Sequence, residues 1–436
     1  MTQIYKHVEN NNEPKIKQFS KFVKLLSILL LLMVWSSTMA SNVAQAQTTV
    51  YLTVASDGSA KYKDIQSAIN AVPSDAYGDI HVKVGTYVPT YKAASDHGSG
   101  AFIYLKSNLY IHGDGIGKTI IKRGTTYGST SNIDMFGNTV SLTNVIIEGM
   151  TLNGMSGPTV SKIQNGYGSA INLSHNRSLK NTMIIIRSVE ALNWGCGFMG
   201  RNVIGTDFND NFGLILEDCH TSNGWTSMTF LNSAFVIVQN NRFEKTAGKR
   251  SDGRQGGDAI FPQATTTYRP SGTSGLSHDW IVKGNYVYDI GDTGFDATTT
   301  DGMSPQYNFL FEGNTMVNAF LRSSGSKNVI VRGNTFYDSS SGTYDKAEIS
   351  FDGGKGKPID ILVESNTVTS SRSHGIDLCC TDSGASKVLG LDGVYRSSGT
   401  IVKNNVIKML TSGKGLNLSC NGDVYSSGNT VNGKPA

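Results

Sequence analysis

The chain has 436 residues, of which 49 are Gly and 17% are charged, and a formal net charge of +4 at pH 7. This composition excludes a disordered chain and favours a turn-rich β protein over a helical one. Residues 1–46 hold five Lys and two Glu and so account for +3 of the charge. The rest of the chain is near neutral, which excludes a global basic field for nucleic acid.

Residues 1–46 have the pattern of a signal peptide. Lys residues at 15, 17, 21 and 24 precede an apolar run, Leu25–Trp35, that is too short to span a bilayer. A small-x-small cleavage site follows at residues 44–46. We therefore expect a secreted, extracellular protein that begins near Gln47 and has no membrane segment in its mature form.

Residues 47–90 are predicted to form an N-terminal cap. A helix is expected from Tyr62 to Val72 and ends at Pro73, and a strand with a Gly turn follows at 80–88. The apolar side chains of this helix share one face: Ile65, Ala68, Ile69 and Val72. Such a helix covers the open hydrophobic end of a stack of coils.

From residue 102 onward, apolar strands alternate with bends rich in Gly, Asn and Ser. The early segments are 102–121, 144–154, 182–192 and 214–224, and a repeated phrase then fills the second half of the chain. Its copies are VIVQNNRF (236–243), WIVKGNYV (280–287), FLFEGNTM (309–316), VIVRGNTF (329–336), ILVESNTV (361–368) and TIVKNNVI (400–407).

Each copy is an apolar strand, an Asn at a bend and a second short strand. The bend Asn residues 241, 285, 314, 334, 366 and 405 are separated by 44, 29, 20, 32 and 39 residues. A repeat with such elastic spacing is typical of a solenoid, and parallel strands without crossover helices predict a parallel β-helix. We expect these Asn residues to adopt the αL conformation and to stack as hydrogen-bonded ladders, which is a structural role.

Two early segments carry a resemblance to known families. The cap at 54–88 looks like the opening segment of pectin methylesterases, and KSNLYIHGDGIGKTIIK (106–122) is similar to the start of mannuronan C5-epimerase modules. With the repeat, residues 50–430 resemble the right-handed β-helix of the pectin lyase-like superfamily. The resemblance implies an all-β, single-stranded right-handed parallel β-helix with a short N-terminal capping helix and one catalytic domain over 47–436.

A register for the outward face follows from HGIDLCC (374–380) and KGLNLSC (414–420), which match almost residue for residue. Applied to the preceding coils, it predicts an outward column of Asp258, Asp296 and Arg322. Later coils would add Ser350 and Asp377 with Asp352 beside them, and earlier coils would add Asn172, Met199 and Thr229, with Arg201 in the adjacent column. Neighbouring carboxylates repel, so a bound cation, a shared proton or an Arg must compensate. The structural alternative is a solvated polar stripe.

A basic insertion leads into this column. Residues 245–257 hold the densest basic segment after residue 46, and the next insertion, 265–280, adds aromatic and His side chains. Cationic groups pair with uronate carboxylates, so an acidic polysaccharide is the predicted partner, unless this is an ordinary solvated loop. The predicted substrate-binding residues are Lys245, Arg250, Arg254, Tyr268, His278 and Asp377.

The leading hypothesis is a secreted polysaccharide lyase that cleaves alginate or pectate by β-elimination. The uronate carboxylate must be neutralised, and Asp258 and Asp296 are the predicted ligands of a hard cation such as Ca²⁺, the one cofactor considered. By the resemblance Arg322 is the base, with Lys249 and Arg201 as rivals. The alternatives are a glycoside hydrolase with Asp258 and Asp296 as its carboxylate pair, and a carbohydrate-binding solenoid without catalysis.

The five cysteines are Cys196, Cys219, Cys379, Cys380 and Cys420. An odd number leaves at least one thiol unpaired. Cys380 and Cys420 are predicted to stack on neighbouring coils, either as a disulfide or as a reduced ladder, and the pairing of Cys196 with Cys219 is open. A capped solenoid needs no partner for stability, so a monomer is expected.

Overall fold

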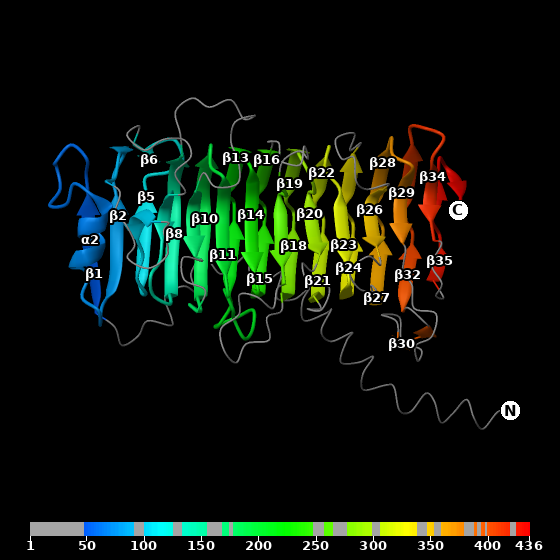
Figure 1. Cartoon of the computed structure of the whole chain (residues 1–436), viewed down its shortest axis with the longest axis horizontal. Coiled ribbons are helices and arrows are strands. Elements are labelled where there is room, and N and C mark those ends of the chain that lie inside the picture. Colours follow the sequence, from blue (N-terminus) through cyan, green and yellow to red (C-terminus); the bar gives the residue numbers. More distant parts are fainter. Residues whose placement is uncertain are drawn as a thin grey trace, which may run out of the picture.

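The computed structural model is a long stack of coils that runs from the cap to the C-terminus (Figure 1). The predicted signal peptide and the first residue after it lie outside the described residues. The structure describes residues 48–90, 100–124, 133–154, 168–173, 178–246, 257–264, 277–298, 306–337, 347–352, 359–378, 388–389, 394–396, 399–418 and 424–436.

Two parallel sheets run along the stack, so the predicted β-helix is confirmed. Sheet B contributes one strand to each coil. Its strands are β4 (Gly100–Tyr104), β7 (Ile133–Gly137), β9 (Ser169–Leu173), β11 (Cys196–Arg201), β14 (Thr226–Leu231), β17 (Ile260–Gln263), β20 (Phe295–Thr298), β23 (Leu321–Ser324), β26 (Ala347–Asp352), β29 (His374–Leu378) and β34 (Lys414–Asn417).

Sheet A receives two strands from most coils, on either side of the Asn bend. The strands before the bend are β1 (Thr49–Val54), β2 (Tyr77–Val82), β5 (Leu109–Gly113), β12 (Leu214–Glu217), β15 (Ala234–Gln239), β18 (His278–Lys283), β21 (Gln306–Glu312), β24 (Ser326–Arg332), β27 (Ile359–Glu364), β32 (Thr400–Lys403) and β35 (Val424–Ser427). Two long strands, β8 (Thr143–Asn153) and β10 (Thr182–Leu192), pass through both positions.

The strands after the bend are shorter. They are β3 (Gly85–Tyr87), β6 (Thr119–Lys122), β13 (His220–Gly224), β16 (Arg242–Thr246), β19 (Tyr286–Ile290), β22 (Thr315–Val317), β25 (Thr335–Tyr337), β28 (Thr367–Ser370), β33 (Val406–Met409) and β36 (Thr430–Val431). Antiparallel pairs are β36 with β37 (Lys434–Pro435), and β30 (Val388–Leu389) with β31 (Tyr395–Arg396).

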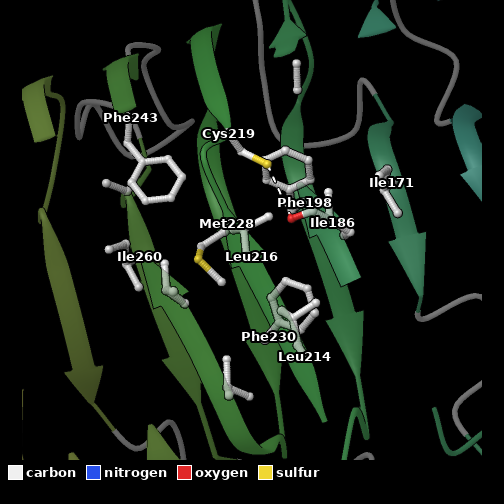
Figure 2. Close-up of a cluster of buried hydrophobic side chains, with 14 of the residues drawn as sticks. Ile171, Ile186, Phe198, Leu214, Leu216, Cys219, Met228, Phe230, Phe243 and Ile260 are labelled. Carbon is white, nitrogen blue, oxygen red and sulfur yellow. Dashed lines mark hydrogen bonds between the residues drawn. The ribbon is translucent and has the colours of Figure 1, made fainter. Parts of the chain in front are cut away.

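Alternate side chains of both sheets point inward and form one continuous hydrophobic core. Figure 2 shows one section, in which Phe198 and Phe230 of sheet B face Ile186 and Leu216 of sheet A. The outward residues of sheet B are therefore the ones available for chemistry, because the inward ones fill the core.

The cap helix is confirmed in place but is shorter than predicted. Helix α2 spans Ile65–Ala71 and is capped by Asp64, whose carboxylate accepts a hydrogen bond of 2.8 Å from the amide of Ser67. Its buried side chains pack against β1, β2 and β4. The described residues contain no helix both long and apolar enough to cross a membrane.

The Asn ladder is confirmed in the second half of the chain. Each ladder Asn is buried and donates from Nδ2 to the Oδ1 of the next, through distances of 2.9–3.0 Å from Asn241 to Asn429. The αL prediction was wrong by one residue, since positive φ falls on the residue before each ladder Asn, for example 63° at Gly284 and 57° at Asn404. The ladder Asn must keep its side chain directed along the stack, so the preceding residue makes the bend.

The cysteines in the described residues are not cross-linked. Cys196 and Cys219 are free thiols, which answers the pairing left open above. Cys219 is buried in the core and its Sγ lies 3.5 Å from the carbonyl oxygen of Ile186 (Figure 2). Burial raises the pKa of both thiols, that of Cys196 to about 12. Cys379, Cys380 and Cys420 lie outside the described residues.

Candidate functional site

The predicted outward column exists on sheet B, with one important change. Strand pairing aligns Asn172 with Met199 and Thr229 on the earlier coils. On the later coils it aligns Asp296, Arg322, Ser350, Asp377 and Asn417. The backbone of Asp352 lies opposite Ser324, beside this column, as predicted.

Asp258 is not in the column, so its predicted register was wrong. Ile260 pairs with Phe295 in the core, which places Phe261 rather than Asp258 next to Asp296. Asp258 lies three residues earlier, in the bend before β17, where the amide of Ala259 donates to the carbonyl of Thr293. The prediction laid Asp258 over Asp296 as if both lay inside their strands, but β17 begins only at Ile260, two residues after Asp258.

The bend nevertheless brings Asp258 into the electrostatic neighbourhood of Asp296. Asp258 is 7% exposed and Asp296 is 3% exposed. Arg322, on the next coil, donates from Nη2 to Asp296 Oδ2 and keeps 23% of its side chain exposed. Asp292 lies in the bend before β20, and its Oδ1 is 3.3 Å from the hydroxyl of Thr293. The site is therefore three carboxyl groups and one guanidinium.

Asp292 was missed by the sequence analysis. It belongs to the segment DIGDTGFD (289–296), which holds three acidic residues around a strand start. A search for bends that are rich in acidic residues would have identified Asp292 as a candidate site residue. The outward column alone misses it because Asp292 precedes β20 by three residues.

The pKa of Asp258 is raised well above its ordinary value of 3.8. Burial is the largest cause, because a charged carboxylate loses its hydration there, and the charges of Asp296 and Asp292 add to it. The positive charge of Arg322 offsets part of the rise. Asp258 thus keeps its proton to a higher pH than an ordinary Asp does, and it lies near an Asp296 that is paired with Arg322.

This pKa predicts a pH dependence of stability. The folded state holds the proton of Asp258 more tightly than the unfolded state, so the free energy of unfolding falls as pH rises from 3.8 through the raised pKa. The variant Asp258→Asn has no proton to lose at this position, so its free energy of unfolding lacks this fall.

In urea unfolding between pH 3.8 and the raised pKa, we expect the stability of Asp258→Asn relative to the wild type to increase with pH. If the stabilities of Asp258→Asn and the wild type change with pH in parallel, the raised pKa of Asp258 is contradicted. The control is Asp289→Asn, because Asp289 is an exposed carboxylate on β19, and the stability of this variant should follow that of the wild type at every pH.

The predicted calcium site finds little support in these residues. Oδ1 of Asp258 and Oδ1 of Asp296 are buried without a hydrogen-bond partner among the described residues. However, Asp296 Oδ2 accepts from Arg322, and the described residues hold no group of three or more His, Cys, Asp or Glu arranged for a metal ion. Ca²⁺ needs six to eight oxygen ligands, so a calcium role stays a prediction.

The other predicted residues are dispersed. Arg201 ends β11 in the outward column next to that of Met199, as predicted. His278 begins β18 in sheet A, where its ring stacks on Tyr307 at 4.7 Å and its Nδ1 is 2.6 Å from Asp279. Lys245 is exposed on β16, also in sheet A. Lys249, Arg250, Arg254 and Tyr268 lie outside the described residues.

A second polar group occupies the column near its C-terminal end. His374 Nδ1 lies 3.5 Å from Asp377 Oδ2, and Asn417 donates from Nδ2 to Asp377 Oδ1 at 2.9 Å. All three side chains are half-buried. Sheet B ends at β34, so this group marks the end of the column. His374 was not predicted as a site residue.

Comparison with solved structures places the fold among known ones. The tailspike protein of E. coli bacteriophage HK620, in complex with a pentasaccharide, has a TM-score of 0.51 at 15% identity, and the match covers 84% of this chain. This chain spans 60% of the length of that tailspike chain. A second structure of this tailspike, with a hexasaccharide, has a TM-score of 0.50 at 16% identity and covers 84% and 59% of the two chains.

The mannuronan C-5 epimerase A-module of Azotobacter vinelandii has a TM-score of 0.46 at 14% identity, with 84% of this chain and 92% of that module covered. The likeness to the tailspike protein shows the fold alone. The chain has a parallel β-helix fold, as the sequence resemblance implied, and shares its overall fold with the tailspike protein. No protein-family model and no curated protein matches the chain.

Proposed function

We propose that the protein is a glycoside hydrolase that cleaves a polysaccharide lying along the outward face of sheet B. Asp258 is the general acid and Asp296 is its carboxylate partner. The observation that carries this proposal is the raised pKa of Asp258 next to an Asp296 that is paired with Arg322. Glycoside hydrolases use a catalytic pair of this kind, in which a protonated acid and an anionic carboxylate flank the glycosidic bond.

In the proposed reaction, Asp258 gives its proton to the glycosidic oxygen as the bond from that oxygen to the sugar carbon breaks. Asp296 lies on the adjacent coil and stabilises the positive charge that develops on the sugar. Water forms the new bond to the sugar carbon through its oxygen, and the proton that it loses returns to the Asp258 carboxylate, which restores the acid. Arg322, whose guanidinium is always charged, holds Asp296 in place through its hydrogen bond to Oδ2.

The lyase hypothesis assigns Arg322 a different task, that of the base. Such a base must release its proton, yet Arg322 donates to Asp296, and a neighbouring carboxylate stabilises the charged form of an arginine. The described geometry therefore favours the hydrolase over the lyase. An extracellular location, with the predicted signal peptide removed, suits action on a polymer.

The products of the reaction test the proposal. We expect the purified protein to release reducing ends from at least one polymer in a panel of alginate, pectate and neutral glucans. The ultraviolet absorbance of an unsaturated uronate should stay at its starting value. A rise of that absorbance would identify a lyase instead, and binding without any cleavage would identify a carbohydrate-binding solenoid. Addition of a chelator to the same assays tests the calcium prediction.

A further inference from the structure

The group of His374, Asp377 and Asn417 at the end of sheet B is unlike the other His–Asp pairs among the described residues, whose atoms lie 2.6–2.9 Å apart. His112 Nε2 and Asp79 Oδ1 on sheet A lie 2.9 Å apart in a direct hydrogen bond. His374 Nδ1 is buried and has no hydrogen-bond partner among the described residues, although Asp377 Oδ2 is 3.5 Å away. The imidazole thus lies beside a half-buried carboxylate without a direct hydrogen bond to it.

The position of this group relates it to the catalytic site. Asp296, Arg322, Ser350 and Asp377 occupy one register position on four successive strands. Adjacent strands are about 4.8 Å apart, so Asp377 lies roughly 14 Å from the position of Asp296 along the column. This is too far for a part in the bond cleavage, yet a polysaccharide on sheet B that reaches Asp296 and follows the column passes over Asp377.

The chemistry of the group suits an uncharged sugar. A carboxylate accepts hydrogen bonds from sugar hydroxyl groups, and an imidazole either donates or accepts one. Asn417 holds Asp377 Oδ1 in place, and 15% of the His374 side chain and 19% of the Asp377 side chain stay exposed on the outer face of sheet B, where a ligand can reach them. A uronate carboxylate would be repelled by Asp377 at this point.

We propose that His374 and Asp377 form a distal subsite that binds the hydroxyl groups of an uncharged sugar unit, several units away from the cleaved bond. This inference rests on the proposed function for its substrate, a polysaccharide on sheet B. It adds that the enzyme prefers long chains, because only a long chain occupies the catalytic site and the distal subsite together. It also adds that the sugar at the distal subsite is not a uronate.

The double variant His374→Gln/Asp377→Asn tests the subsite, and His112→Gln/Asp79→Asn is a matched control with the same changes on sheet A. On the polymer that the panel identifies, we expect the first variant to raise KM about tenfold or more with kcat little changed, since hydrogen bonds to charged groups are worth about 1.5–3 kcal/mol. On short oligosaccharides of the same polymer, both variants should match the wild type.

Binding is measured independently of cleavage by retardation in native gels that contain each polymer of the panel, in an Asp258→Asn background. Weaker retardation of the His374→Gln/Asp377→Asn variant alone supports the subsite, even if the wild-type protein hydrolyses nothing and the proposed function fails. Equal retardation of both double variants overturns the subsite, even if hydrolysis is observed. Retardation by alginate and pectate but by no neutral glucan, or by no polymer at all, also overturns it.

Discussion

Replacing Asp258 by Asn is expected to lower kcat by about 100- to 10,000-fold, the usual contribution of a general acid. The amide has nearly the shape of the acid but has no proton to give to the leaving oxygen. Because the pKa of Asp258 is raised by burial, the wild-type side chain is protonated at pH values where an ordinary Asp is not. The measurement is the initial rate of reducing-end release on the polymer that the wild type cleaves best.

Asp289→Asn is the matched control for this loss. Asp289 lies on β19, ahead of the bend that holds Asp292, is exposed, and has a φ of 54° that Asn also tolerates. We expect its rate to equal that of the wild type. Near-normal activity of Asp258→Asn would remove Asp258 from the mechanism. A loss of activity together with a lowered melting temperature would instead indicate misfolding, which the unfolding curves described above detect.

Replacing Asn314 by Ala is expected to lower the free energy of unfolding by about 3–5 kcal/mol. The Nδ2 group of Asn314 donates to Asn334 Oδ1 and to the carbonyl of Val282, at 3.0 Å each. Its Oδ1 accepts from the amide and the side chain of Asn285, at 2.9 Å each. Alanine removes all four of these hydrogen bonds. Asn334 Oδ1 keeps the one from the Asn314 amide and Asn285 Nδ2 keeps the one to Val238, but the buried amide of Asn285 loses its partner, and each buried group left unsatisfied costs about 1–3 kcal/mol.

The control for the ladder is Thr335→Ala, an exposed side chain next to the ladder residue Asn334 on β25. A surface substitution of this kind usually changes stability by no more than about 0.5 kcal/mol. Urea unfolding monitored by circular dichroism compares the two variants with the wild type. Equal stability of Asn314→Ala and Thr335→Ala would show that the ladder is not a main source of stability.

The repeat in the sequence determined the architecture because its parts act locally. Alternating apolar residues determine which side chains point inward, and a polar amide at each bend needs a buried partner that only the next coil supplies. The same alternation placed Asp296, Arg322, Ser350 and Asp377 in one column correctly. In each of these cases the strand itself carries the information.

The tertiary structure decided the residues at the bends. Asp258 and Asp292 precede their strands, where no alternation applies, and only the hydrogen bonds between neighbouring coils settle where they lie. The raised pKa of Asp258 depends on burial and on charges from another coil, and the pairing of Arg322 with Asp296 joins residues 26 apart in the chain. The sequence by itself therefore determined the β-helix and its outward column. Folding decided which carboxyl group holds a proton, because that depends on distances and desolvation that arise only between coils.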